Sequence, residues 1–492
     1  MGPRSRPMMM RMLASSSNSR FGSVRCGTLH WPRERLFVVC PDLKKFMHIR
    51  IIGGSDAGIS AALRAREINR DADISVFLAD DYPNYSICGL PFYLSGETPD
   101  WHSLAHRTEF EGVNVHRNSR VKHIDLRQKA ISVQGTNGTV EYLSFDQLVI
   151  ATGAVPVRPE IEGTNLPGVY ELHTMGDSFK VKDHLKQLGA KSAIIIGAGY
   201  IGVEMADALS HLGLKVTLVG RSRVVFPSVD PELGVLIECG LRKHFVEVVN
   251  GTEVAKIESI PSGLLVTAKD GWRKDAELVL LVVGVRPDSD LARQAGVPLG
   301  GRGAIQVNLR METGIPGVYA AGDCVETWHH VLQRFTYLPL GTTSHKQGRV
   351  AGENSAGGNR EFAGSVGTQV VKIFDMAIAR TGLRQREAND FGRHAATTES
   401  TFWDHKAYYP GAEELRFRVT GDPISGKLLG AQIVGHWKAE VSKRIDVFAT
   451  ALFHQMTVDG LNDLDLSYTP PVSSPWDPVQ MSAQAWLREN RK

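Results

Sequence analysis

Hydrophobic and polar positions repeat one pattern twice along the chain. Apolar strands over 49–52 and 193–196 each end in a glycine-rich turn, are followed by a helix, and lead to a further apolar strand over 74–78 or 215–219. The turns read Gly53-Gly54-Ser55-Asp56-Ala57-Gly58 and Gly197-Ala198-Gly199-Tyr200-Ile201-Gly202. Strand, glycine turn and helix in this order predict two dinucleotide-binding βαβ units.

The glycines of these turns have a physical purpose. Gly53 permits the tight turn, small residues let the backbone approach a pyrophosphate, and the following helix N-terminus faces its charge. The second turn carries the full GxGxxG spacing, whereas Ser55 replaces the middle glycine of the first. The end of the strand at 74–78 is Leu78 rather than an acid, so Asp80 is the nearest candidate to bind an adenosine ribose.

Two short segments complete the nucleotide folds. An apolar strand ends in Ala151-Thr152-Gly153, and another ends in Gly322-Asp323, where a carboxylate can accept hydrogen bonds from the ribitol hydroxyls of a flavin. The segment 281–287, which contains Gly284, closes the second unit. The order of these pieces predicts an FAD-binding fold with a second nucleotide fold inserted into it.

A single cysteine follows the first glycine turn. Cys88 lies in Asn84-Tyr85-Ser86-Ile87-Cys88-Gly89, and Tyr93 occupies the place where a second redox cysteine would stand. A thiol at this point of a flavin-binding unit can lie against the flavin ring. Without a partner cysteine it would cycle through a mixed disulfide, a persulfide or a sulfenic acid. The alternative is a buried cysteine that only packs.

The second unit carries arginines where an acid would select NADH. The strand over 215–219 is followed by Gly220-Arg221-Ser222-Arg223. An acid there would bind the ribose 2′-hydroxyl, whereas guanidinium groups match a 2′-phosphate. Arg221 and Arg223 therefore predict a preference for NADPH, with a merely solvated turn as the alternative.

Composition excludes several classes of protein. The 492 residues carry a net charge of +3, which favours no nucleic-acid partner. The five cysteines are widely spaced without a CxxC pair, which fits a reducing, cytosol-like compartment. There is no run of 18 apolar residues, so we expect no membrane span. Residues 1–46 are rich in Arg and Ser; they resemble an organelle transit peptide, but a start at Met47 is the favoured interpretation.

These motifs, over 47–492, resemble the pyridine nucleotide–disulfide oxidoreductases, and the single cysteine resembles their coenzyme A disulfide reductase and NADH oxidase branch. Two C-terminal stretches resemble the interface domain of that branch: His405-Lys406-Ala407-Tyr408-Tyr409-Pro410-Gly411 and Tyr468-Thr469-Pro470-Pro471. The resemblance implies a homodimer in which Tyr468 and either Tyr408 or Tyr409 reach the partner's redox cysteine. It also implies substrate contacts from Asn84, Ser86, Arg64 and Arg66.

Three positions depart from the family pattern. Ile87 stands where the family usually has Asn, and Glu67 stands where it has a basic residue; Arg64 and Arg66 are the candidate replacements for coenzyme A binding. Asp56 replaces the histidine of the peroxidases, which argues against peroxidase chemistry.

We expect an α/β protein with two Rossmann-like domains and a C-terminal α+β dimerisation domain. The boundaries are a 1–46 extension, an FAD-binding domain over 47–155 and 288–360, an NAD(P)H-binding domain over 156–287, and a dimerisation domain over 361–492. The expected activity is FAD-dependent, NAD(P)H-driven reduction of a small disulfide or persulfide at Cys88. The helix N-terminus and the flavin are expected to stabilise the Cys88 thiolate and so lower its pKa. An NAD(P)H oxidase using a Cys88 sulfenate and a redox-sensing flavoprotein remain the alternatives.

Overall fold

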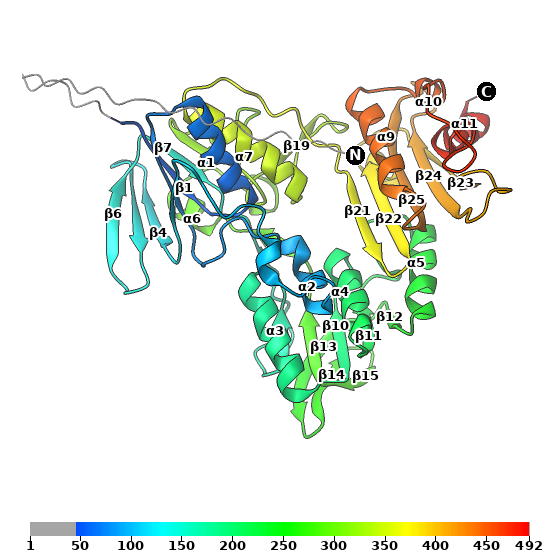
Figure 1. Cartoon of the computed structure of the whole chain (residues 1–492), viewed down its shortest axis with the longest axis horizontal. Helices are drawn as coiled ribbons and strands as arrows, with labels where there is room; N and C mark the ends of the chain where they lie inside the picture. The colour runs from blue at the N-terminus through cyan, green and yellow to red at the C-terminus, as the bar shows by residue number, and fades with distance from the viewer. Residues whose placement is uncertain (1–45, 492) are drawn as a thin grey trace, which may run out of the picture. The chain divides into compact units, whose positions relative to one another are not determined.

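The structure is a computed structural model that describes residues 46–491. Its first sheet (Figure 1) holds five parallel strands in the order β18-β7-β1-β2-β3. Their bounds are Val318–Ala320, Gln147–Ile150, His48–Ile52, Asp73–Phe77 and Asn114–His116. The central strand β1 is apolar and buried because it pairs on both sides, with β2 and β7. The interpretation of 1–46 lies almost wholly outside the described residues.

Helices α1 (Asp56–Ile68) and α7 (Gly341–Ser355) lie side by side against this sheet. The helix expected after the first glycine turn is α1, which begins at Asp56 because Ser55 is extended and is its N-cap residue. A Cβ on Gly348 would stand 2.2 Å from the carbonyl oxygen of Ala57, so only glycine permits this approach. The antiparallel strands β4 (Arg120–Asp125), β5 (Ala130–Gln134) and β6 (Val140–Ser144) form a separate three-stranded sheet.

The second nucleotide fold repeats the first. Its parallel sheet has the order β12-β11-β10-β16-β9, over Glu247–Asn250, Lys215–Gly220, Ser192–Ile196, Leu278–Leu281 and Val169–Glu171. Three helices accompany it: α3 (Met175–Leu188), α4 (Tyr200–His211) and α5 (Pro231–Lys243). The antiparallel strands β13 (Val254–Ile260), β14 (Gly263–Ala268) and β15 (Arg273–Ala276) stand beside it.

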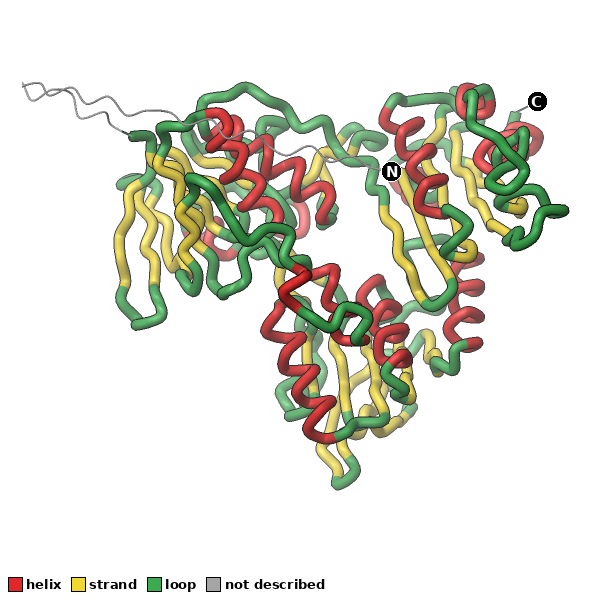
Figure 2. The backbone as a smooth tube through the Cα atoms, viewed as in Figure 1, coloured by secondary structure: helices red, strands yellow, loops and turns green. Residues whose placement is uncertain are grey.

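The C-terminal part is an antiparallel sheet covered by helices (Figure 2). The strand order is β21-β22-β25-β24-β23, over Gln369–Ile373, Met376–Gly382, Leu428–His436, Glu414–Gly421 and Ala396–Trp403. Helices α9 (Val441–Phe453) and α11 (Pro478–Asn490) pack on it, with α8 (Gln385–Asp390) and α10 (Val458–Asn462) nearby. Its main core includes Phe417, Phe448 and Trp486, whereas Ile373 and Val434 of the same sheet belong to the core of the second nucleotide fold.

The chain crosses between the two nucleotide folds at one small sheet. β8 (Ala154–Pro156) pairs antiparallel with β17 (Val285–Pro287), so the outgoing and returning crossovers lie together. The boundaries expected at 155/156 and 287/288 fall within and directly after these strands. The short helix α2 (Leu90–Ser95), although part of the first sequence block, packs against α3 and α4 of the second fold. The segment that carries Cys88 therefore joins the two folds.

No helix in residues 46–491 is both long and apolar enough to cross a membrane.

Candidate active site

The first glycine turn brings β1, α1 and β7 to one point. Gly53 has a positive φ of 110°, and a Cβ there would lie 2.0 Å from the carbonyl oxygen of Ala151. A Cβ on Gly58 would lie 1.9 Å from the carbonyl oxygen of Gly53. Both glycines are therefore required for the backbone to fold back on itself, which exposes the N-terminus of α1 to a cleft. That cleft is also lined by Gly54, Ser55, Asp56, Ala57, Ala151, Thr152 and Gly153.

Two carboxylates flank this turn. Asp80 lies just beyond β2, accepts a 3.0 Å hydrogen bond from the amide of Tyr82, and has its pKa raised mainly by burial. Asp323 follows β18 and accepts a 2.7 Å hydrogen bond from Ser344 Oγ; burial again raises its pKa. Both carboxylates line the cleft, where they are placed to accept hydrogen bonds from hydroxyl groups. The turn and these carboxylates suit an FAD molecule: as the sequence predicts, Asp80 would hold its adenosine ribose and Asp323 its ribitol.

The second glycine turn has the same construction. A Cβ on Gly197 would lie 2.4 Å from the carbonyl oxygen of Val282, and one on Gly202 would lie 1.8 Å from that of Gly197. Gly199 and Gly284 have open space around them instead, and both line the cleft together with Tyr200 and Ile201. The two turns therefore face one connected cleft of about 2290 Å³. A second dinucleotide fits there beside the first.

The structure separates the two arginines of the nucleotide-selecting loop. Gly220 ends β11, and Arg221 follows it into the cleft. Arg223 is exposed but does not line the cleft. Among the two, only Arg221 is placed to contact a 2′-phosphate at the end of β11.

Cys88 lies in a single turn of 3₁₀ helix, η1 (Ile87–Gly89), directly before α2. Its thiol is unpaired and lines the cleft that the two glycine turns share. The expectation of a lowered pKa is not met by the protein's own groups. Desolvation raises the pKa of Cys88, and the negative charges of Glu204, Asp56 and Asp323 add to the rise. The flavin, the other expected source of thiolate stabilisation, stays a prediction.

Sequence reasoning missed Glu204. This residue lies in α4, lines the cleft and is half-buried; desolvation raises its pKa to about 7, and the nearby charge of Asp207 contributes. The signal was available, because Glu204 stands one helical turn after Tyr200 and therefore on the same face of a helix that begins at the nucleotide turn. Glu204 is the described cleft acid that changes protonation near neutral pH.

The structure does not bring the four expected substrate residues into the cleft. Arg64 is held by Glu353, with contacts of 2.6 and 2.8 Å, and by Glu67 at 2.6 Å. Arg66 donates to the backbone carbonyls of Gly112, Arg70 and Ala72, where it closes the end of α1. Neither guanidinium is free to replace the family's basic residue, because its donors are already used.

Asn84 and Ser86 do not line the cleft themselves, although the side-chain amide of Asn84 lies 3.5 Å from Oδ1 of Asp56, which does. Asn84 is buried with a positive φ of 56°, and its amide donates to the carbonyl of Gly54 at 2.8 Å. The amide of Ser86 donates to the carbonyl of Leu104 at 2.8 Å. Of the loop, the cleft is lined by Tyr82, Tyr85, Ile87 and Cys88.

The two tyrosine-bearing stretches meet on the C-terminal part. The amide of Lys406 donates to the carbonyl of Pro470 at 3.3 Å. Buried Arg444 ties both stretches together through the carbonyl of Asp404 at 2.7 Å and the carboxylate of Asp477 at 3.2 Å. Tyr408, Tyr409 and Tyr468 are 74%, 44% and 43% exposed and do not line this chain's own cleft. All three side chains are therefore accessible to solvent in the single chain.

Comparisons with known proteins agree with this geometry. The family model described as pyridine nucleotide-disulphide oxidoreductase matches residues 47–348, and the model of that family's dimerisation domain matches residues 368–478. The NAD(P)H coenzyme A polysulfide/persulfide reductase of Pyrococcus horikoshii is 36% identical over 439 residues, which are 88% of this chain and 97% of that protein. The NADH oxidase of Methanocaldococcus jannaschii is 32% identical over 455 residues, which are 90% of this chain and 99% of that protein.

Solved structures give the same result. A NAD-dependent persulfide reductase from A. fulgidus matches with a TM-score of 0.87 and 37% identity, over 90% of this chain and 83% of that chain. A water-forming NADH oxidase from Lactobacillus brevis, bound to NADH, matches with a TM-score of 0.86 and 27% identity, over 90% of this chain and 98% of that chain. The predicted resemblance and fold class are thereby confirmed.

Proposed function

Because this chain belongs to the pyridine nucleotide-disulphide oxidoreductases, we propose that it reduces a small disulfide or persulfide at Cys88. FAD and NAD(P)H are its cofactors, in keeping with that family. The observation that carries the proposal is the position of Cys88, an unpaired thiol in the cleft that both nucleotide turns face. The polysulfide/persulfide reductase relative supports this choice of acceptor.

The chain's own residues account for the sulfur chemistry. The Cys88 thiolate attacks one sulfur of the substrate, the sulfur–sulfur bond breaks, and the leaving sulfur departs as a thiolate that takes up a proton. This step leaves Cys88 in a mixed disulfide or persulfide. When bound, FAD supplies two-electron transfer between the nicotinamide and sulfur. The two electrons that return Cys88 to the thiolate and release the second product originate from NAD(P)H.

The proposal includes the assembly and the nicotinamide. A homodimer, supported by the dimerisation-domain match, would place the aromatic surface of Tyr408, Tyr409 and Tyr468 against the partner's cleft. Tyr468 would then donate a hydrogen bond to the leaving sulfur. NADPH is the preferred reductant, supported by Arg221 in the cleft and Gly220 at the end of β11. The unpaired thiols of Cys88, Cys239 and Cys324 support a reducing, cytosol-like compartment.

The test is turnover of the FAD-loaded enzyme with NADPH and coenzyme A disulfide or a persulfide under anaerobic conditions. Cys88→Ser should lower sulfur-dependent turnover to below about 1% of wild type while leaving FAD bound and reducible by NADPH. Cys239→Ser is the matched control, because that thiol is also exposed and unpaired but lies on α5 outside the cleft. Undiminished turnover by Cys88→Ser would refute the role of this thiol.

The oxidase alternative is supported by the NADH oxidase relatives. Oxygen consumption that exceeds sulfur-dependent turnover would establish it, with Cys88 cycling as a sulfenic acid. Negligible turnover with either acceptor, despite a reducible flavin, would favour a redox-sensing role.

A further inference from the structure

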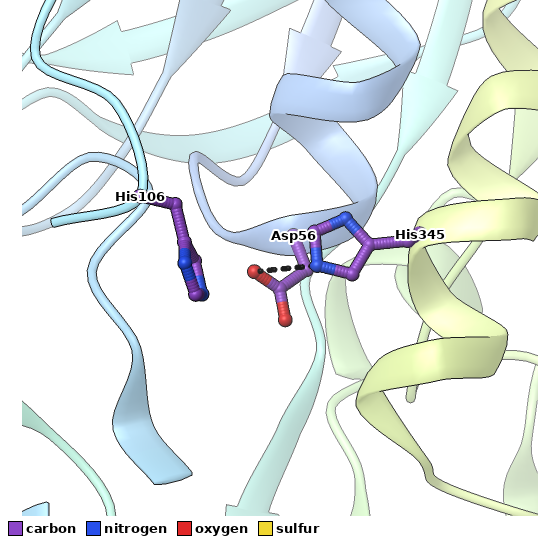
Figure 3. A group of neighbouring side chains, drawn as sticks. All are labelled: Asp56, His106 and His345. Carbon is purple, nitrogen blue, oxygen red and sulfur yellow. Dashed lines mark ion pairs between the residues drawn. The ribbon is translucent and has the colours of Figure 1, made fainter. Parts of the chain in front are cut away.

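Three metal-ligating side chains from separate segments converge beside the Cys88 cleft (Figure 3). Asp56 is the first residue of α1, His106 lies in the loop before β3, and His345 lies in α7. One ligand atom from each lies within 4.8 Å of the other two. Only Asp56 was singled out by the sequence, and neither histidine has a role in the proposed chemistry.

His345 is oriented by its neighbours. Ser60 Oγ lies 3.0 Å from Nδ1 of His345, and Nε2 on the other side of the ring lies 3.4 Å from Oδ1 of Asp56. Histidines that bind metals are commonly fixed in this way, with one ring nitrogen held by a polar partner and the other directed at the ion. Ser60 therefore presents Nε2 to the space that Asp56 faces.

The position of His106 is set by its backbone. Its amide donates to the carbonyl of Asn84 at 3.0 Å, and the adjacent Ala105 bridges to Tyr85. The ring centroid lies 6.1 Å from that of His345, at an interplanar angle of 70°. Both histidines are exposed, so packing into a core does not explain why the rings turn toward Asp56.

We propose that Asp56, His106 and His345 bind a divalent transition-metal cation of the Zn²⁺ type, with water in the remaining position. Two imidazoles and one carboxylate suit Zn²⁺, and three protein ligands with one open position are typical of an accessible zinc site. Mg²⁺ does not suit this site, because it prefers a shell made entirely of oxygen ligands. This site does not depend on the proposed reductase function.

The location gives the ion a structural consequence. His106 is hydrogen-bonded to the loop that carries Cys88, whereas His345 belongs to α7. Asp56 and Cys88 line the same cleft. A bound cation would cross-link the cysteine loop to α1 and α7 through Asp56, a side chain that lines the same cleft as Cys88.

The test is a Zn²⁺ titration of metal-free, FAD-loaded protein against a chromophoric chelator. It uses the Cys88→Ser background, so that the thiolate cannot supply a competing ligand. His106→Gln combined with His345→Gln should weaken the site at least about tenfold, because loss of an outer partner alone typically costs 10- to 100-fold in affinity. His102→Gln is the matched control, since this exposed histidine pairs with Asp100 at 2.7 Å and no third described ligand joins them. It should leave the titration unchanged, and excess Mg²⁺ should not displace Zn²⁺.

A milder variant keeps the test decisive if the double variant loses its flavin. Ser60→Ala retains all three ligands but releases Nδ1 of His345, so it should weaken Zn²⁺ binding by about 10-fold or more with the flavin spectrum unchanged. The proposal is overturned if parent protein binds no Zn²⁺ that these variants remove, or if His102→Gln weakens binding as much as they do.

Discussion

At the scale of single residues, the cleft holds several carboxylates near Cys88, although the proposed chemistry needs a thiolate there. Glu204, Asp56 and Asp323 all raise the pKa of Cys88, in addition to desolvation. Glu204 itself has a pKa raised to about 7 by burial. A carboxyl group in that state loses its proton near neutral pH at a cost to the folded protein.

Glu204→Gln should therefore change stability in a pH-dependent way. A folded-state pKa raised above the ordinary value makes the folded state bind more protons than the unfolded state between about pH 4.5 and 7, so stability falls as pH rises through that window. The variant should match wild type near pH 5 and be more stable near pH 8, by about 1 kcal/mol or more. Thermal unfolding at both values measures this, and an equal difference at both would contradict it.

Substitution of Arg221 and of Arg223 tests whether this loop selects NADPH or is only a solvated turn. Arg221→Ala should lower the preference for NADPH over NADH at least about tenfold in kcat/KM, or ~1.4 kcal/mol, mainly through KM for NADPH. Arg223→Ala is the matched control, because its side chain lies outside the cleft and should leave the ratio nearly unchanged. Steady-state kinetics with both nucleotides decide the point, and a wild-type preference for NADH would refute the assignment.

At the scale of elements, the two nucleotide turns bring a strand and a helix together with the same close backbone contacts. In each, one glycine lies against the carbonyl of a neighbouring strand's end, and the last glycine lies against the carbonyl of the first. Helices α1 and α4 can begin at these points because glycine has no Cβ to collide with the carbonyl groups.

Two substitutions in the second turn should have different effects. Gly202→Ala should destabilise the fold by about 1–3 kcal/mol, because its Cβ would overlap the carbonyl oxygen of Gly197. Gly199→Ala meets no protein atom within 4 Å and should leave the melting temperature unchanged, while raising KM for NADPH by occupying the cleft. Thermal unfolding and kinetics of the pair test this, and equal melting temperatures would contradict it.

At the scale of the whole molecule, the cleft of the described chain does not include the exposed tyrosines Tyr408, Tyr409 and Tyr468. Lys406, Arg444 and Asp477 hold the segments that carry them together. The match to the family's dimerisation domain supports a homodimer, and the proposed active site requires these tyrosines to face the partner's cleft.

Tyr468→Phe should slow sulfur-dependent turnover by about 10- to 100-fold, the scale for loss of one positioned proton donor. The reduction of FAD by NADPH should be unchanged, since that step does not use the tyrosine. Stopped-flow measurement of both half-reactions tests this, and sedimentation should give a dimer for both proteins. A fully active wild-type monomer would refute the shared site.

The sequence by itself determined the parts whose chemistry is local. Several features can be recognised from a few consecutive residues. They are the glycine turns, Asp80 and Asp323 after their strands, the unpaired Cys88 and the loop at Arg221. Local backbone conformation restricts the residue type at such positions. The family and the α/β fold class followed from their order and are confirmed.

Only the tertiary structure decided where side chains meet. Arg64 is paired with Glu353, and Arg66 donates to the carbonyl of Gly112. Both partners are far away in sequence, so a local pattern does not predict these contacts. The rise in the pKa of Cys88 comes first from desolvation and then from the charge of Glu204, which is distant in sequence. Asp56, His106 and His345 converge because the packing of α1 against α7, and of one loop against another, brings them together. The burial of a side chain, and the meeting of side chains from distant segments, depend on many long-range contacts. A sequence pattern reveals such contacts only where they restrict the local backbone.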